Sequence, residues 1–362
     1  MKQSQVKCTF LPSSPLKIVR FDPYEWSILR IIYNEHYTKV ILYIHKETKK
    51  LGALKLYQRN KMTDREIKRK EQDFQKEVHV HTLFDGVDHI LPLWFWFVSD
   101  TEWGLMTKYM NHSFLLKRLY DYHCEECILH TVIYPLLKSV EYLHRNHIIH
   151  RDIKPENIFI HNHRIYLADF GYSHILSNTD EYCSSFAGTL NYMAPELLHH
   201  YVSKDSVLKY KYEIDIWAIG IILYEIIFHI KPFGWSEHKN YTRNDPTRPH
   251  FILACLKNNL LFPKPVSSNV QDFIKKCLQK NPIDRATIRE LLEHPWIINY
   301  LKLRAVKNIS SQCQRISKLP ADQSQSQLQS QKHPYLQTQT VTKGRPITTN
   351  TTPCWKTQCI IC

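Results

Sequence analysis

Two short acidic stretches near the middle of the chain contain the residues best suited to chemistry. The first, residues 150–157, reads His-Arg-Asp-Ile-Lys-Pro-Glu-Asn and places Asp152, Lys154 and Asn157 within six residues. The second is an Asp-Phe-Gly tripeptide that begins at Asp169, twelve residues later. Phosphoryl transfer needs such a set: a carboxylate that orients the attacking hydroxyl, a cation for the moving phosphate, and oxygen ligands for a divalent metal. The spacing therefore indicates phosphotransferase chemistry.

Each of these groups has a definable part in such a reaction. Asp152 is the candidate base, because a carboxylate within hydrogen-bond reach of a hydroxyl can orient it and take its proton late in the transfer. Lys154 lies two residues further on, so in an extended backbone its ammonium points to the same side and balances the charge of the phosphate. Asn157 and Asp169 offer an amide oxygen and a carboxylate, which are ligand types that Mg²⁺ prefers.

Three further motifs follow in the second half of the chain. They are Gly-Thr-Leu-Asn-Tyr-Met-Ala-Pro-Glu at 188–196, Asp-Ile-Trp-Ala-Ile-Gly at 215–220 and His-Pro-Trp at 294–296. Their order resembles the end of the activation segment, the buried helix F and the end of the domain in eukaryotic protein kinases. The Lys-Pro-Glu-Asn sequence and Thr189 resemble the serine/threonine type. The general layout is most similar to the calmodulin-dependent and Aurora-like groups.

The resemblance implies an α+β, bilobal protein-kinase fold. A small antiparallel β-sheet lobe with one helix, at about 21–108, would precede a larger helical lobe at about 111–300. It also implies that the γ-phosphate of ATP is transferred, with Mg²⁺, to serine or threonine hydroxyls of protein substrates. We expect residues 1–20 to be a variable lead-in to this 21–300 kinase domain. We expect 303–362, which is basic and rich in Gln, Ser and Thr, to be a disordered tail.

The same resemblance assigns the nucleotide site. Lys55, in an Ala-x-Lys motif, matches the lysine that pairs with the α and β phosphates, and Glu77 matches the glutamate that pairs with this lysine. Thr107 corresponds to the gatekeeper of the adenine pocket, and the hinge behind it ends at Met110. The side chains assigned around the nucleotide, beside Lys55 and Glu77, are Val40, Ala53, Thr107, Met110 and Phe159.

Five residues take structural parts in the resemblance. His150 and Phe170 are expected to be apolar-facing supports of the two acidic stretches. Arg285 is expected to form an ion pair with Glu196 of the Ala-Pro-Glu motif. Asp215 is expected to open the buried helix F.

One stretch departs from the family pattern. Where relatives have Gly-x-Gly-x-x-Gly-x-Val, residues 33–40 read Tyr-Asn-Glu-His-Tyr-Thr-Lys-Val and contain no glycine. Glycine lets a backbone approach phosphate closely, and Glu35 adds like charge near a triphosphate unless it points outward. Two hypotheses follow: an active kinase with an altered loop, or a pseudokinase that acts as a scaffold or allosteric partner. The retained polar residues favour activity, because they supply the base, the charge and the metal ligands.

The resemblance also bears on activation and on substrate choice. Ser185, with Ser184 second, is the candidate for a phosphate added by an upstream kinase or by autophosphorylation, since Arg151 is the type of residue that binds such a phosphate. The alternative is that both are ordinary loop serines. In basophilic relatives, the glutamates that correspond to Glu156 and Glu225 receive substrate arginines by bidentate pairing. This predicts a preference for Arg or Lys upstream of the phosphoacceptor.

The catalytic stretches need secondary structure to hold them. Residues 26–57 contain apolar, β-branched runs around a polar turn, which predicts a hairpin and a following strand. Residues 62–84 have a helical composition. Apolar residues between 133 and 148 recur at helical spacing, and Pro135 predicts a kink or a helix start there. The apolar run 214–230 contains three ionisable residues and is interpreted as a buried helix rather than a membrane span.

Composition limits the remaining classes of function. A chain of 362 residues with 43% hydrophobic residues can bury a core. The net charge is +14, and from Lys302 onward nine Lys or Arg stand against one acid, so the tail carries +8. These charges are scattered rather than clustered, which favours a solvated arm over a surface for membranes or nucleic acid. A nucleic-acid-binding protein would rest on net charge alone.

Cysteine usage and the two ends of the chain bear on location. The ten cysteines lack the spacing of a disulfide scaffold, and no apolar signal core follows Met1. We therefore expect an intracellular, cytoplasmic protein, with nuclear or lipid-anchored locations as alternatives. Cys124 and Cys127 form a lone Cys-x-x-Cys, for which burial or exposure on a helix is favoured over zinc binding. The last four residues, Cys359-Ile-Ile-Cys362, have the form of a prenylation box, so membrane association depends on whether Cys359 is modified or left free.

Overall fold

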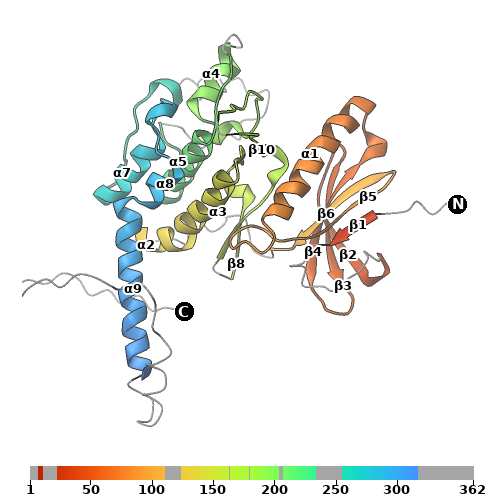
Figure 1. Ribbon diagram of the computed structural model, residues 1–362, viewed down its shortest axis with the longest axis horizontal. Coiled ribbons are helices and arrows are strands. Elements are labelled where there is room, and N and C mark those ends of the chain that lie inside the picture. The colour runs from red at the N-terminus through yellow and green to blue at the C-terminus, as the bar shows by residue number, and fades with distance from the viewer. Residues whose placement is uncertain are drawn as a thin grey trace, which may run out of the picture. The chain divides into compact units, whose positions relative to one another are not determined.

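The structure is a computed structural model in which most of the first 316 residues are described. The chain divides into two units, Met1–Leu303 and Arg304–Cys362. Figure 1 shows the order of the helices and strands along the chain. The described residues are 7–10, 23–110, 124–162, 164–178, 180–203, 207–233 and 255–316.

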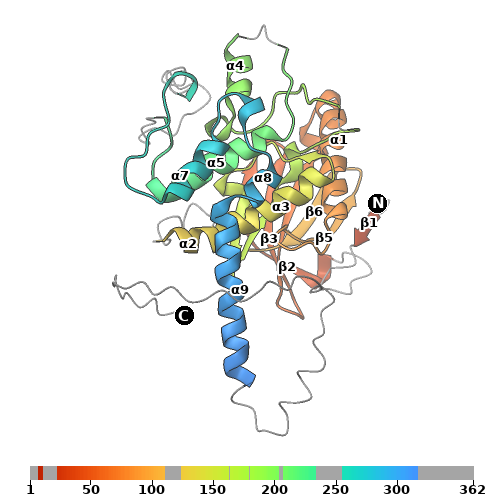
Figure 2. The same ribbon diagram turned by 60° about the vertical axis from the view of Figure 1, so that its left-hand side comes forward.

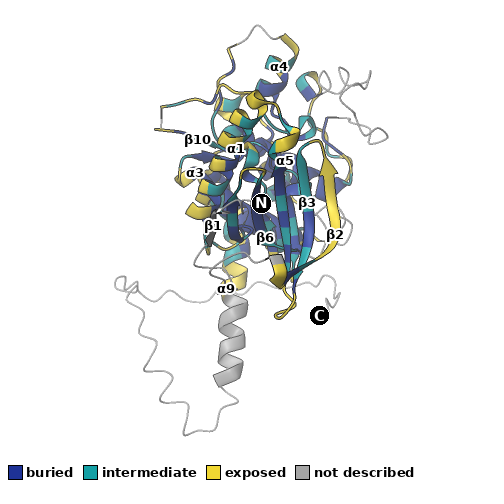
Figure 3. Ribbon diagram, turned by 90° about the vertical axis from the view of Figure 1, so that its right-hand side faces the viewer, coloured by how far each residue is buried: buried dark blue, intermediate teal, exposed yellow. Residues whose placement is uncertain are grey.

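The first lobe is built on a six-stranded antiparallel sheet. Its strands are β1 (Lys7–Phe10), β2 (Trp26–Glu35), β3 (Thr38–His45), β4 (Leu51–Gln58), β5 (Leu93–Val98) and β6 (Glu102–Lys108). The spatial order is β1-β5-β6-β4-β3-β2, so β2 is an edge strand, and it is exposed along most of its length (Figure 3). Side chains alternate along a strand, so Leu54 and Leu56 of β4 enter one apolar cluster while Lys55 and Tyr57 face the other way.

Helix α1 (Asp64–Leu83) lies along one side of this sheet (Figure 1). It begins at a capping box, in which the side chain of Thr63 accepts from the backbone N–H of Glu66 and the Glu66 carboxylate accepts from the backbone N–H of Thr63. The helical period puts its buried residues on one face, so one carboxylate is turned into the protein. These residues are Phe74, Glu77, Val80 and His81.

The second lobe is helical and centres on α5 (Glu213–Phe228). Every residue from Ile214 to Phe228 is buried, which is the pattern of a helix surrounded by other elements and agrees with the prediction. Helix α3 packs beside α8, and α5 beside α7 (Figure 2). No helix in the described part of the chain could cross a membrane, since none combines the length and the apolar run. The other helices are α2 (Glu125–Ile128), α3 (Tyr134–Arg145), α4 (Pro195–Ser203), α7 (Ser268–Cys277), α8 (Ile288–Leu292) and α9 (Pro295–Ile316).

Four short strands hold the two acidic stretches between them. Strand β8 pairs with β9 and β7 pairs with β10, both in antiparallel fashion. Asp152 follows β7, and Asp169 lies between β9 and β10. The predicted α+β, bilobal kinase fold is confirmed by this arrangement. The strands are β7 (Ile148–Ile149), β8 (Ile158–His161), β9 (Arg164–Leu167) and β10 (His174–Ile175).

The helix that contains Pro135 begins one residue before it, which confirms the predicted helix start near the proline. A π-helical turn, η4 (Leu129–Ile133), connects α2 to α3, and Pro135 lies in the first turn of α3. Proline has no backbone N–H, so the first turn of a helix tolerates it, and a π turn alters the bonding pattern just before it.

Two expectations about the ends of the domain need correction. Within the expected lead-in, Lys7–Phe10 forms β1 and pairs with β5, so four of these residues extend the sheet. The expected disordered tail does not begin at 303, because α9 (Pro295–Ile316) continues as a helix as far as Ile316. The sequence from 304 to 316 contains neither proline nor glycine, so nothing in it breaks a helix that has already begun. Cys359 and the rest of 317–362 lie outside the described residues.

The Cys-x-x-Cys motif is exposed at the start of α2. Cys124 and Cys127 are joined by a disulfide, with their Cα atoms 5.3 Å apart. Exposure on a helix agrees with the prediction. The disulfide was not predicted, and it is possible because one helical turn brings the two sulfurs together. In the described part of the chain no group of three or more His, Cys, Asp or Glu is placed to hold a metal ion in the way zinc requires.

Candidate active site

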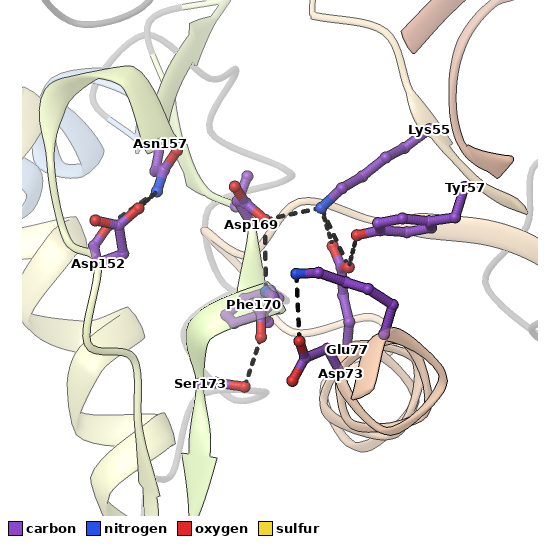
Figure 4. Close-up of polar contacts among 12 residues, drawn as sticks. Lys55, Tyr57, Asp73, Glu77, Asp152, Asn157, Asp169, Phe170 and Ser173 are labelled. Atoms are coloured by element: carbon purple, nitrogen blue, oxygen red, sulfur yellow. Dashed lines mark hydrogen bonds and ion pairs between the residues drawn. The ribbon is translucent and has the colours of Figure 1, made fainter. Parts of the chain in front are cut away.

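Asp152 is held by three donors from the surrounding loops. Its Oδ1 accepts a hydrogen bond from Thr189 Oγ1 at 2.6 Å. Its Oδ2 accepts from Asn157 Nδ2 at 3.1 Å, as Figure 4 shows, and forms an ion pair with Lys154 Nζ at 2.8 Å. Lys154 also donates to Thr189 at 2.8 Å. The candidate base and the candidate cation are therefore in contact, and a carboxylate fixed in this way needs little reorganisation before it orients a hydroxyl.

The backbone in front of Asp152 is braced from the buried helix α5. Asp215 accepts the backbone N–H groups of His150 and Arg151, both at 2.9 Å, and a ring nitrogen of His144 at 2.9 Å. Arg151 has a φ of 67°, a left-handed conformation that costs a non-glycine residue about 1–3 kcal/mol. Burial raises the pKa of Asp215, but its contacts with His144 and His150 hold that pKa below the ordinary value. The anion therefore persists as a brace for the strained loop.

A second polar cluster joins the two lobes (Figure 4). Lys55 Nζ lies 2.9 and 3.1 Å from the two carboxylate oxygens of Glu77 and 3.0 Å from Oδ1 of Asp169. The hydroxyl of Tyr57 donates to Glu77 at 3.0 Å. The Lys55–Glu77 pair was assigned from the resemblance, whereas Tyr57 was not. It follows from the period-2 face that Tyr57 shares with Lys55 on β4.

The charges in this cluster support one another. Burial lowers the pKa of Lys55, but Asp169 and Glu77 outweigh it and raise that pKa well above its ordinary value. Burial likewise opposes ionisation of Asp169, yet Lys55 holds its pKa at about 2. Lys55 is therefore a cation and Asp169 an anion at neutral pH, as phosphate and metal binding require.

The residues assigned to the adenine pocket come from both lobes. Ala53 and Thr107 are opposite each other in the β4–β6 pairing, and Val40 is opposite Lys55 in the β3–β4 pairing. Met110 belongs to a small apolar cluster against which Phe159 packs. The apolar character of these side chains suits a flat aromatic ring.

The glycine-free stretch forms a tight hairpin between β2 and β3. Only His36 and Tyr37 separate the strands, and His36 has a φ of 49° in the left-handed region. The backbone carbonyl of Tyr37 accepts from Gln58 at 2.8 Å, which ties the turn to β4. Glu35 is exposed, and its carboxylate accepts the hydroxyl of Tyr33 at 2.8 Å. Histidine thus takes the conformation that glycine would otherwise supply, and the acid engages a neighbouring side chain.

His81 adds an ionisable group beside the second acidic stretch. It lies one turn after Glu77 on α1, and its ring meets that of Phe170 edge-on with centroids 4.8 Å apart. Burial, with Lys55 nearby, lowers the pKa of His81 to about 3. His81 and Phe170 therefore pack as neutral rings at physiological pH.

This burial predicts a loss of stability in mild acid. The unfolded chain binds a proton at His81 near the ordinary pKa of 6.5, and the folded protein does so only near 3, so falling pH favours unfolding from about 6.5 downward. The His81 contribution should lower the free energy of unfolding by about 2 kcal/mol between pH 7 and pH 5. Urea unfolding of wild type and His81→Leu at both pH values measures it. The exposed His79→Leu serves as control, and an equal pH slope in wild type and His81→Leu would contradict the prediction.

Arg151 connects the catalytic loop to the activation segment. Its Nη1 donates to Ser185 Oγ at 2.6 Å, to Cys183 Sγ at 3.2 Å and to the hydroxyl of Tyr210 at 3.1 Å. Cys183 is buried, which raises its pKa, but hydrogen bonding with His174, Ser185 and Tyr210, together with the charge of Arg151, brings that pKa down to about 6. Ser184 is exposed. Of the two candidate phosphosites, only Ser185 touches the guanidinium.

The end of the activation segment is fixed at two points. Gly188 has a φ of 110°, and a Cβ there would lie 2.4 Å from the backbone oxygen of Arg151, so this position requires glycine. Further on, Arg285 forms a bidentate ion pair with Glu196, with N–O distances of 2.8 and 3.0 Å. His150 is fully buried against Phe170, in the supporting position assigned to both residues.

This arrangement is that of a phosphotransferase site. It combines a carboxylate base beside a cation, a second lysine paired to a glutamate of α1, and an ionised Asp169. The protein kinase domain model matches residues 27–297, and the chain therefore belongs to the protein kinase family. It is a protein serine/threonine kinase, which uses ATP and a divalent metal and acts on protein substrates. The pseudokinase hypothesis finds no support, since every polar residue of the catalytic set is present and in contact with its partners.

The curated relatives agree with the Aurora-like and calmodulin-dependent type. An Aurora kinase of Eremothecium gossypii is 27% identical over 82% of this chain and 75% of its own length. An Aurora kinase of Debaryomyces hansenii is 31% identical over 72% of this chain and 59% of its own length. A calcium/calmodulin-dependent protein kinase type I of Schizosaccharomyces pombe is 30% identical over 76% of this chain and 79% of its own length.

The residues that would hold the metal are suited to a hard divalent cation. Asp169 is an anion whose side chain is 40% exposed. Asn157 uses its amide nitrogen toward Asp152, and among the described residues its amide oxygen has no hydrogen-bond donor. Asp169 and Asn157 would hold such a cation, which would supply positive charge for the phosphates when bound. The positions of the chain's own residues suit the remaining roles: Lys55 and Lys154 would hold phosphate charge, and Asp152 would orient the hydroxyl and receive its proton.

Proposed function

We propose that this kinase uses Mg²⁺ with ATP and is switched on by phosphorylation of Ser185, either by an upstream kinase or by another copy of itself. The single observation behind the activation step is the 2.6 Å contact between the Ser185 hydroxyl and Arg151, next to the catalytic Asp152. A phosphate there would add nearly two negative charges and strong acceptors to a site that already holds a guanidinium. The activation segment would be ordered against the catalytic loop.

The paired variants Ser185→Ala and Ser184→Ala test this step. After incubation with ATP, Ser185→Ala should be at least about tenfold less active than wild type, because one charge-assisted contact with Arg151 cannot form. Ser184→Ala should respond like wild type. Phosphatase treatment should lower the activity of wild type and of Ser184→Ala, which both retain Ser185, but not that of Ser185→Ala. Mass spectrometry that finds active protein bare at both serines would remove the proposal.

We further propose a cytoplasmic location, because the reaction consumes ATP and acts on proteins. Membrane association is tied to prenylation of Cys359, and an unmodified end is the alternative. Metabolic labelling with a prenyl analogue, with Cys359→Ser as the control, decides between them. Nucleic acid is not proposed as a partner.

A further inference from the structure

A buried lysine pairs with a carboxylate below the activation segment. Lys231 follows α5, and its side chain is only 10% exposed. Its Nζ lies 2.5 Å from Oε2 of Glu225 and donates to the hydroxyl of Tyr192 at 2.8 Å. That hydroxyl donates in turn to Glu225 at 3.0 Å, and the ammonium lies 4.1 Å from the centre of the tyrosine ring. The cation is therefore fixed by three separate contacts.

This cluster lies beside the catalytic carboxylate. Tyr192 comes three residues after Thr189, which donates to Asp152, and all three side chains line one small cavity. Glu156 belongs to the catalytic stretch itself, four residues after Asp152. Burial raises the pKa of Tyr192 well above its ordinary value, and the negative charges of Glu225 and Glu156 raise it further. Tyr192 thus links the Lys231–Glu225 pair to the residues around Asp152.

The two carboxylates differ in what they can still bind. Glu225 already has an ammonium and a phenol on its carboxylate. A second cation would meet the charge of Lys231 there, and like charges at such separation repel strongly in a partly buried site. Glu156 has a buried Oε2 with no hydrogen-bond partner among the described residues. A buried acceptor without a partner is the place where a donor from outside would be stabilised.

We propose that Lys231 binds the Glu225 carboxylate in place of a basic substrate side chain. Glu156 alone then selects Arg or Lys in the substrate. This inference rests on the proposed function, because it concerns the protein substrate of the same site. It revises the expectation that Glu156 and Glu225 both receive substrate arginines. The substrates of this kinase then need one basic residue upstream of the phosphoacceptor rather than two.

Peptide kinetics test the inference directly. A neutral serine peptide is compared with versions that carry one arginine at each upstream position, and the readout is the kcat/KM ratio of arginine to neutral peptide. Glu225→Gln should leave the wild-type ratios unchanged, whereas Glu156→Gln should remove the preference. Lys231→Met should raise the ratio about tenfold at a further position, because a freed carboxylate can accept a guanidinium. Lys264→Met removes an exposed lysine of the same lobe and should keep the wild-type ratios.

Each outcome bears on one claim. If Glu225→Gln lowers the arginine ratio as much as Glu156→Gln, Glu225 binds substrate and the inference is overturned, whether or not Lys231→Met folds. If Lys231→Met unfolds like wild type in a thermal melt yet gains no arginine preference, the inference is also overturned. If wild type labels the neutral peptide no more than Asp152→Asn does, the proposed function is wrong, and the inference falls with it.

Discussion

Asp152→Asn should lower kcat for phosphoryl transfer about 10³-fold, within the range that a positioned general base contributes. Asparagine has nearly the same shape, but it cannot take the proton of the attacking hydroxyl, and it removes the charge that pairs with Lys154 at 2.8 Å. The nucleotide contacts assigned to Lys55 come from the other lobe, so ATP binding should survive. Transfer from radiolabelled ATP to a serine peptide measures the loss.

The control for this prediction is a second neutralised aspartate. Asp88 is exposed and forms a surface ion pair with Arg164, so Asp88→Asn should transfer phosphate at the wild-type rate. Nucleotide binding to Asp152→Asn, followed by fluorescence or calorimetry, separates a lost base from a damaged fold. Equal incorporation by wild type and Asp152→Asn would mean that the label does not come from this site.

The residues of the catalytic stretches could be predicted because they are close together in sequence. The six residues 152–157 contain Asp152, Lys154 and Asn157, so the conformation of one short loop fixes their relative positions. The fold class followed from the resemblance of the motifs, and the different periodicities of the strand-rich and helix-rich halves agree with it. Glu77 needed the resemblance, since a charged helix offers several glutamates, and only burial against Lys55 distinguishes this one.

The residues that were missed act across a turn or between elements. Tyr57 and His81 could have been found, since each shares a strand face or a helix face with an assigned residue. Lys231 could not, because its contact with Glu225 depends on a reversal at His229, which ends α5 with a φ of 58° in the left-handed region. Nothing in the sequence requires a histidine to take that conformation. Tertiary packing decides it, and the substrate site is altered as a result.

Arg285→Met should destabilise the domain by about 3–5 kcal/mol, because it leaves Glu196 partly buried without its cation. The Arg285 side chain is fully buried, and besides Glu196 it donates to the backbone carbonyls of Glu213 and Gln279 at 2.8 and 3.0 Å. Its guanidinium also lies 5.1 Å from the ring centre of Trp217. One substitution therefore breaks an ion pair, several hydrogen bonds and a cation–π contact in the core of the helical lobe.

The same chain offers a matched substitution four residues away. Arg289 is 85% exposed and pairs with an exposed Glu293, so Arg289→Met should cost no more than about 0.5 kcal/mol. Urea unfolding of both variants, monitored by tryptophan fluorescence, measures the difference. The two arginines differ in burial. When Arg289 is lost, water replaces it as the partner of the exposed Glu293 at little cost, whereas the partly buried Glu196 has no water to replace Arg285. Equal losses in the two variants would show that the Arg285–Glu196 pair does not hold the activation segment to the lobe.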